Sequence, residues 1–114
     1  MGRYLQVRVS VSTVDEDVVH RVWPALVKLA WADGLPPEGR KGVLELTAAL
    51  ADRLALGMLP AVAAKALEKA ARRAEALRLE LEDALAGRKP AEADQKTYAL
   101  EDALDEAEDL VRKL

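Results

Sequence analysis

The chain has 114 residues, the length of one domain, and its 20 acidic and 17 basic residues give a formal net charge of −3. It has no cysteine, which excludes disulfides and thiolate metal ligands and suits the reducing cytoplasm, where we expect the protein to reside. Neither half has the strongly basic balance of a nucleic-acid-binding domain, and no apolar run reaches membrane-spanning length. The apolar residues are mostly alanine and leucine, so we expect a thin core that favours a partner.

Residues 3–12 alternate between apolar and polar residues, which predicts a half-buried β-strand. No second strand is evident, and one strand cannot satisfy its backbone hydrogen bonds alone. We therefore predict that it pairs with the same strand of a second copy across a homodimer axis, although the sheet edge of another protein would also serve. The apolar residues of this dimer strand are Leu5, Val7, Val9 and Val11.

A helix is predicted over residues 13–32, because Thr13 and Glu16 have the spacing of a capping box. Pro24 lies inside this helix and lacks a backbone donor, so we expect a kink or a break near Trp23. Trp23 and Trp31 are predicted to bury the largest area in the amino-terminal half.

A loop rich in glycine and proline follows over residues 33–42. It has four residues between Gly34 and Gly39 but lacks the lysine that a phosphate-binding loop places directly after its second glycine. A second helix is predicted over residues 41–56. Its apolar face consists of Val43, Leu46, Leu50 and Leu54.

Two long helices, over residues 60–86 and 90–114, are predicted to form an antiparallel hairpin. The first has apolar residues at gaps that alternate between three and four: Leu67, Ala70, Ala74, Leu77, Leu81 and Ala84. The second repeats this pattern around one polar position, Lys96: Ala93, Leu100, Ala103, Ala107, Leu110 and Leu114. Folding the chain at residues 87–90 pairs the two seams so that opposing residue numbers add to 177.

This register predicts two ion pairs at the rim of the seam, Lys69 with Glu108 and Arg72 with Asp105. At the turn, Gly87 suits a position with positive φ just past a helix end. Pro90 suits the first turn of the next helix.

Acidic residues over 101–109 could suggest a magnesium site, but the predicted seam directs most of them outward or onto its rim, whereas a metal site needs carboxylates that converge in a concavity. One enzymatic alternative is a magnesium-dependent, all-α nucleotide pyrophosphohydrolase. Its candidate residues are Glu80, Asp83, Glu101 and Asp105. His20 is the only histidine, and no serine, histidine and acid pattern of a hydrolytic triad is apparent.

The order of strand, helix, glycine-containing loop and helix over residues 3–56 resembles the ribbon-helix-helix DNA-binding family. The resemblance covers half of the chain and implies a strand ribbon that enters the major groove. It implies these DNA-facing residues: Gln6, Arg8, Ser10, Arg40 and Lys41. The first helix is longer than the family has, and Pro24 interrupts it.

Taken together, these patterns predict a mainly α fold of one domain with four helices, including a carboxyl-terminal hairpin, and one strand paired across a homodimer. Because no convergent catalytic set is evident, we expect a non-enzymatic cytoplasmic interaction or assembly protein that binds protein partners. We expect no cofactor, no metal and no membrane association. DNA binding and nucleotide hydrolysis are the alternatives.

Overall fold

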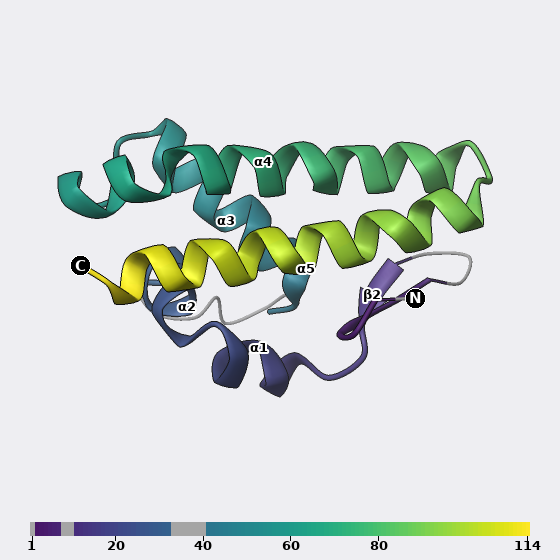
Figure 1. The fold of residues 1–114 in the computed structure, drawn as a ribbon, viewed down its shortest axis with the longest axis horizontal. Coiled ribbons are helices and arrows are strands. Elements are labelled where there is room, and N and C mark those ends of the chain that lie inside the picture. The colour runs from purple at the N-terminus through teal and green to yellow at the C-terminus, as the bar shows by residue number, and fades with distance from the viewer. Residues whose placement is uncertain (1, 8–10, 33–40) are drawn as a thin grey trace.

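A computed structural model describes residues 2–7, 11–32 and 41–114, and in these ranges the chain is mainly helical, as predicted. The elements in chain order are β1 (Leu5–Val7), β2 (Val11–Thr13), α1 (Glu16–Val22), α2 (Pro24–Ala30), α3 (Val43–Ala55), α4 (Ala61–Ala86) and α5 (Pro90–Arg112). The described part thus has five helices rather than four. The hairpin of α4 and α5 runs the length of the molecule, and the shorter elements pack against it (Figure 1).

The predicted seam of α4 is buried along its whole length. In α5, the seam is buried at Ala93, Leu100, Ala103 and Ala107, whereas Leu110 is half-buried. Leu114 is exposed because α5 ends at Arg112. The Nζ atom of Lys96 on α5 lies 3.1 Å from a carboxylate oxygen of Glu80 on α4. Their numbers add to 176, so this ion pair agrees with the predicted register to within one residue.

The two ion pairs predicted at the rim of this seam are wrong. Arg72 lies 3.4 Å from Glu68 of its own helix, and the carboxylates of Asp105 and Glu108 are engaged elsewhere. The physical reason is that the amino-terminal half packs on α5 and supplies these acids with donors at shorter range. The seam pattern predicts which residues face the other helix, but it carries no information about a third element.

The turn between α4 and α5 corrects a further prediction. Gly87 has a φ of −80°, which any residue can adopt, and it is Arg88 that takes the left-handed conformation with a φ of 56°. The N–H of Lys89 donates to the carbonyl of Ala84 at 2.8 Å, so the last turn of α4 is closed by the backbone. Pro90 is the first residue of α5, as predicted.

The amino-terminal segment forms two short strands instead of one. β1 and β2 pair antiparallel within the chain, with Leu5 opposite Thr13 and Val7 opposite Val11. An alternating pattern continues unchanged through a reversal of the chain, so it could not distinguish one strand from a hairpin. The argument for pairing across a dimer axis therefore loses its premise, because the strand has a partner in its own chain.

The predicted helix over residues 13–32 is broken at Trp23, close to Pro24, as expected. Trp23 ends α1 and precedes α2 with φ −125° and ψ 57°, and Pro24 occupies the first position of α2. The predicted capping box is wrong. Asp15 caps α1 by accepting from the N–H of Asp17 at 3.0 Å.

Thr13 instead serves the start of α3. Its hydroxyl oxygen accepts from the N–H of Val43 at 2.8 Å, and Glu45 accepts from the N–H of Gly42 at 3.0 Å. A Cβ atom at Gly42 would lie 2.3 Å from the Thr13 hydroxyl oxygen, so only glycine permits this approach. Glu16, the other half of the predicted box, accepts from the N–H of Lys41 at 3.1 Å.

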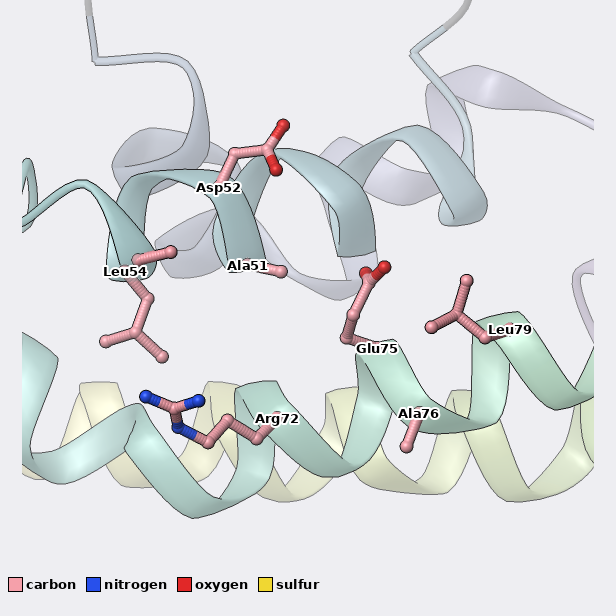
Figure 2. Close-up of a pocket in the computed structure, with 8 residues that line it drawn as sticks. Ala51, Asp52, Leu54, Arg72, Glu75, Ala76 and Leu79 are labelled. Carbon is pink, nitrogen blue, oxygen red and sulfur yellow. The ribbon is translucent and has the colours of Figure 1, made fainter.

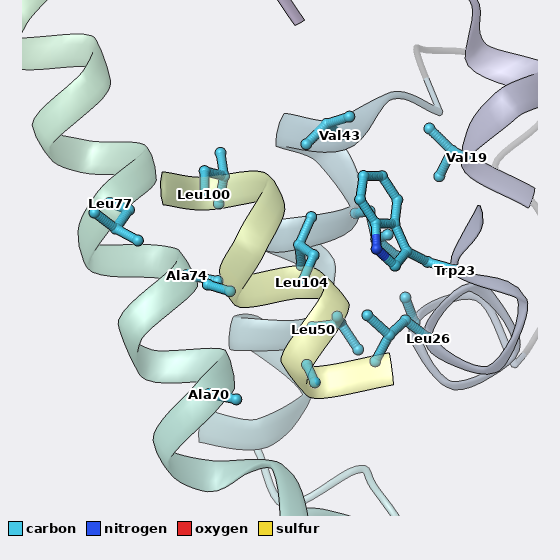
Figure 3. Close-up of a cluster of buried hydrophobic side chains, with 14 of the residues drawn as sticks. Val19, Trp23, Leu26, Val43, Leu50, Ala70, Ala74, Leu77, Leu100 and Leu104 are labelled. Atoms are coloured by element: carbon cyan, nitrogen blue, oxygen red, sulfur yellow. The ribbon is translucent and has the colours of Figure 1, made fainter. Parts of the chain in front are cut away.

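The core lies on both sides of α5, with α4 on one side and Trp23 with its neighbours on the other (Figure 3). Trp23 is fully buried, and the Tyr4 ring meets it edge-on with centroids 5.3 Å apart. Trp31 is half-buried, packs against this core and stacks on His20. None of the described helices combines the length and hydropathy needed to cross a bilayer.

Candidate functional site

The acidic run on α5 holds the amino-terminal half in place. Glu101 is fully buried, and its carboxylate accepts from the N–H groups of Arg3, Tyr4 and Leu5 at 2.7, 2.8 and 2.9 Å. A buried carboxylate is costly unless hydrogen bonds replace its water, and three amide donors do so here. Gly2 lies so close that a Cβ there would be 2.8 Å from both carboxylate oxygens.

Two further acids on the same face of α5 continue this attachment. Asp105 accepts from the indole Nε1–H of Trp23 at 2.8 Å. Glu108 accepts from the N–H groups of Ala25 and Leu26 at 3.2 and 3.0 Å, in the first turn of α2, where the backbone has donors without helical partners. The Nε–H of Arg112 also donates to Glu108 at 2.7 Å. We call Glu101, Asp105 and Glu108 the carboxylate clamp.

These contacts separate the four acids of the hydrolase alternative. Glu101 and Asp105 face the amino-terminal half, whereas Glu80 pairs with Lys96. Asp83 lies beside the α4–α5 turn, in a pocket of about 200 Å³ that Glu80 and Lys89 also line. Across residues 2–7, 11–32 and 41–114, no group of three or more histidine, cysteine or acidic residues is arranged to hold a metal ion.

Most acids of residues 101–109 lie outward or on the rim, as predicted, because Asp102, Glu106 and Asp109 are exposed and Asp105 is half-buried. Sequence reasoning missed the burial of Glu101 and Glu108 and the role of the clamp. A signal was present, because positions 101, 105 and 108 follow the four- and three-residue spacing of a single helix face. An acid stripe adjoining an apolar seam can mark the side on which another element docks through its backbone.

The structure places only part of the DNA-facing set. Arg8, Ser10 and Arg40 lie outside the described residues, as does Val9 of the predicted dimer strand. Gln6 lies opposite Ser12 in the strand pair, and Leu5 is buried in the core. Lys41 is half-buried and precedes α3, with its N–H bonded to Glu16. The described members are thus not brought together on one exposed ribbon.

A groove of about 430 Å³ lies between α3 and α4. It is lined by Ala51, Asp52, Leu54 and Ala55 of α3 and by Arg72, Glu75, Ala76 and Leu79 of α4 (Figure 2). The groove exists because alanines stand where the two helices face each other beyond their shared core. Leu54 and Leu79 add larger apolar surfaces at either end.

Charged residues of both signs border this apolar floor. The guanidinium of Arg78 is bonded to Glu75, with Nε at 3.1 Å from each carboxylate oxygen, and to Glu82 at 2.9 Å. The hydrogen bond to Glu75 raises the pKa of Arg78 above its ordinary value, so this pair stays charged. Asp52 and Arg72 are exposed and can meet charges on a partner.

Several exposed apolar side chains lie on α4 and on its connection to α3. Leu79 is 49% exposed although it lines the groove. Leu56, Met58 and Val62, at the connection between α3 and α4, are each more than half exposed. Apolar surface of this kind beside a groove is typical of a protein-binding face.

Comparisons of the chain with protein-family models, with curated proteins and with solved structures find no match.

Proposed function

We propose that this chain is a non-enzymatic interaction protein whose α3–α4 groove binds an amphipathic helix. The groove carries the proposal, because it combines an alanine floor, exposed leucine and a rim with charges of both signs. Two adjacent helices with an apolar furrow between them offer the surface on which a third helix packs.

The groove sets the chemistry of its occupant. α3 has 13 residues, about 20 Å at the rise of an α-helix, so a partner helix of three to four turns would match it. Its apolar stripe would place branched side chains over Ala51 and Ala55. Its flanking charged residues would pair with Asp52 and Arg72 on the rim of the groove.

The carboxylate clamp supports a non-enzymatic function. Glu101 and Asp105, two of the four candidate acids of the hydrolase alternative, already accept hydrogen bonds from backbone amides and from the indole of Trp23, which is a structural use of these groups. The homodimer predicted from the amino-terminal strand stays a prediction. The groove between α3 and α4 is a separate surface for binding a partner.

The experiment replaces Leu79 with a photo-cross-linking amino acid in cells that express the chain, and the cross-linked peptides are then sequenced. We expect products whose partner segment is an amphipathic helix. The same cross-linker at Gln95, an exposed residue of α5, is the matched control and should not capture that helix.

A groove-filling variant provides the second half of this test. Ala55→Trp places a large side chain in the groove at an exposed position and should abolish the cross-link at Leu79. Ala91→Trp, at an exposed position of α5, should leave it unchanged. Cross-linking that survives Ala55→Trp, or that is equal at Leu79 and Gln95, would contradict the proposal.

A further inference from the structure

The outward side of α4 has a second heptad stripe, distinct from the seam with α5. Its residues are separated by gaps of four, three, four, three and four: Lys65, Lys69, Arg72, Ala76, Leu79 and Asp83. All six are exposed, and three of them line the α3–α4 groove. Four of the six are charged, so the stripe differs from an apolar coiled-coil seam, and a partner would meet it through ion pairs beside Ala76 and Leu79.

Charge is segregated along α4. Residues 61–76 contain four cations and two acids, a net charge of +2, whereas residues 77–86 contain one cation and three acids, a net charge of −2. This order opposes the helix dipole, which favours acids near the start and cations near the end. The first turn of α4 has no acid and its last turn has no cation.

Several of these charges remain available for a partner. Within the described part of the chain, Lys65, Lys69 and Asp83 form no ion pair, and Arg72 makes one exposed contact with Glu68 of its own helix. Asp105 and Glu108, the α5 acids that the sequence register paired with Arg72 and Lys69, are engaged by the amino-terminal half.

We infer that the helix bound at this face is α4 of a second copy of the chain, packed antiparallel about a two-fold axis. The inference rests on the proposed function and names its partner. Two such stripes interlock when opposing residue numbers add to 148, so that Lys65 faces Asp83 of the second copy at two equivalent layers.

The central layers agree with this register. Arg72 faces Ala76, whose small side chain leaves room for it and allows the helices to approach closely. Lys69 faces the Leu79 of the second copy, which then lies near the Leu54 end of the groove. In Figure 2 this end is the one where Leu54 lies above Arg72. A parallel arrangement would instead place Lys65 on Lys65 and Asp83 on Asp83, and like charges repel.

The first experiment measures the mass of the full chain in solution by sedimentation velocity over a range of concentrations. We expect a monomer–dimer equilibrium. Ala76→Arg opposes the Arg72 of the second copy and should raise the dissociation constant at least about tenfold. Ala91→Arg, an exposed alanine on α5, should dimerise like the wild type, and circular dichroism should show equal helicity in both variants.

A charge exchange then tests the register. Lys65→Glu and Asp83→Lys each replace two attractions with two repulsions, so each variant alone should dimerise about tenfold more weakly than the wild type. Mixing the two variants restores opposite charges at both layers and should restore the dimer.

Two outcomes would overturn the inference. A wild-type chain that stays monomeric while Leu79 cross-links to a helix of another protein would overturn it and leave the proposed function intact. A dimer that is insensitive to Ala76→Arg and to the charge exchange, with no cross-link at Leu79, would overturn both.

Discussion

The hairpin of α4 and α5 and the amino-terminal half are held by different forces. In the hairpin, alanine and leucine side chains pack on each other along a regular seam. The amino-terminal half also attaches through polar groups, because carboxylates on α5 accept from the backbone of β1 and α2. The comparison shows that a side-chain pattern reveals packing between apolar faces but not attachment through the backbone.

The two attachments also differ in how they respond to substitution. Seam contacts are individually small and are distributed over many layers, so losing one leaves its neighbours in place. In the clamp, a single carboxylate such as Glu101 satisfies three backbone N–H groups. We therefore expect the clamp to concentrate a larger share of stability in fewer residues.

Trp23→Ala should have the largest effect, lowering the free energy of unfolding by about 3–5 kcal/mol. It removes the largest fully buried side chain and its hydrogen bond to Asp105. Urea denaturation followed by circular dichroism measures this change. Trp31→Ala is the matched control and should cost less, because Trp31 is half-buried; equal losses would contradict the packing described here.

Glu101→Gln should lower the free energy of unfolding by about 2–4 kcal/mol, because an amide group cannot accept from three N–H groups as a carboxylate does. Denaturation at neutral pH measures the loss. Glu106→Gln makes the same change at an exposed position of α5 and should leave stability unaltered. An equal effect of both substitutions would remove the distinction between clamp and surface acids.

Ala74→Leu tests the hairpin side of the comparison. Ala74 is buried and lies opposite Ala103 in the predicted register, where opposing numbers add to 177, so a larger side chain must force α4 and α5 apart. We expect a loss of about 1–3 kcal/mol in thermal or chemical unfolding. Ala91→Leu adds the same atoms at an exposed position of α5, so its unfolding free energy should match the wild type; a loss as large as that of Ala74→Leu would argue against a close seam.

Lys96→Ala should have the smallest effect, about 0.2–1 kcal/mol, because the Lys96–Glu80 pair is partly exposed to water. A double-mutant cycle with Glu80→Ala isolates the interaction between the two side chains. The coupling should fall as salt is added. A coupling of zero at low salt would mean that this pair does not help to set the register.

The sequence predicted the fold correctly where apolar residues repeat at helical spacing or where a proline interrupts a helix. The gaps from Leu67 to Ala84 identified the buried face of α4, and Pro24 identified the helix break. The hairpin of β1 and β2 could not be separated from one strand, because Leu5, Val7 and Val11 fit either arrangement. Arg88, rather than Gly87, takes the positive φ at the turn, which no local preference indicates.

The candidate site was predictable only in hindsight. The stripe from Lys65 to Asp83 has a heptad spacing that the sequence displays, but its exposure depends on where α3 and α5 pack. The groove likewise needs Ala51 and Ala76 to be adjacent, although 25 positions separate them in the chain. The role of the clamp acids could be predicted only by knowing that β1 and α2 lie against α5.

Amide hydrogen exchange in the wild type and in Glu101→Gln, residue by residue, tests most directly whether the clamp fastens the amino-terminal half to the hairpin. Under native conditions, we predict faster exchange at Tyr4 and Leu5, whose N–H groups bind Glu101, with unchanged protection at Ala74 in the α4 seam. Unchanged exchange at Tyr4 and Leu5, or an equal acceleration throughout α4, would contradict the separate attachment of the two regions.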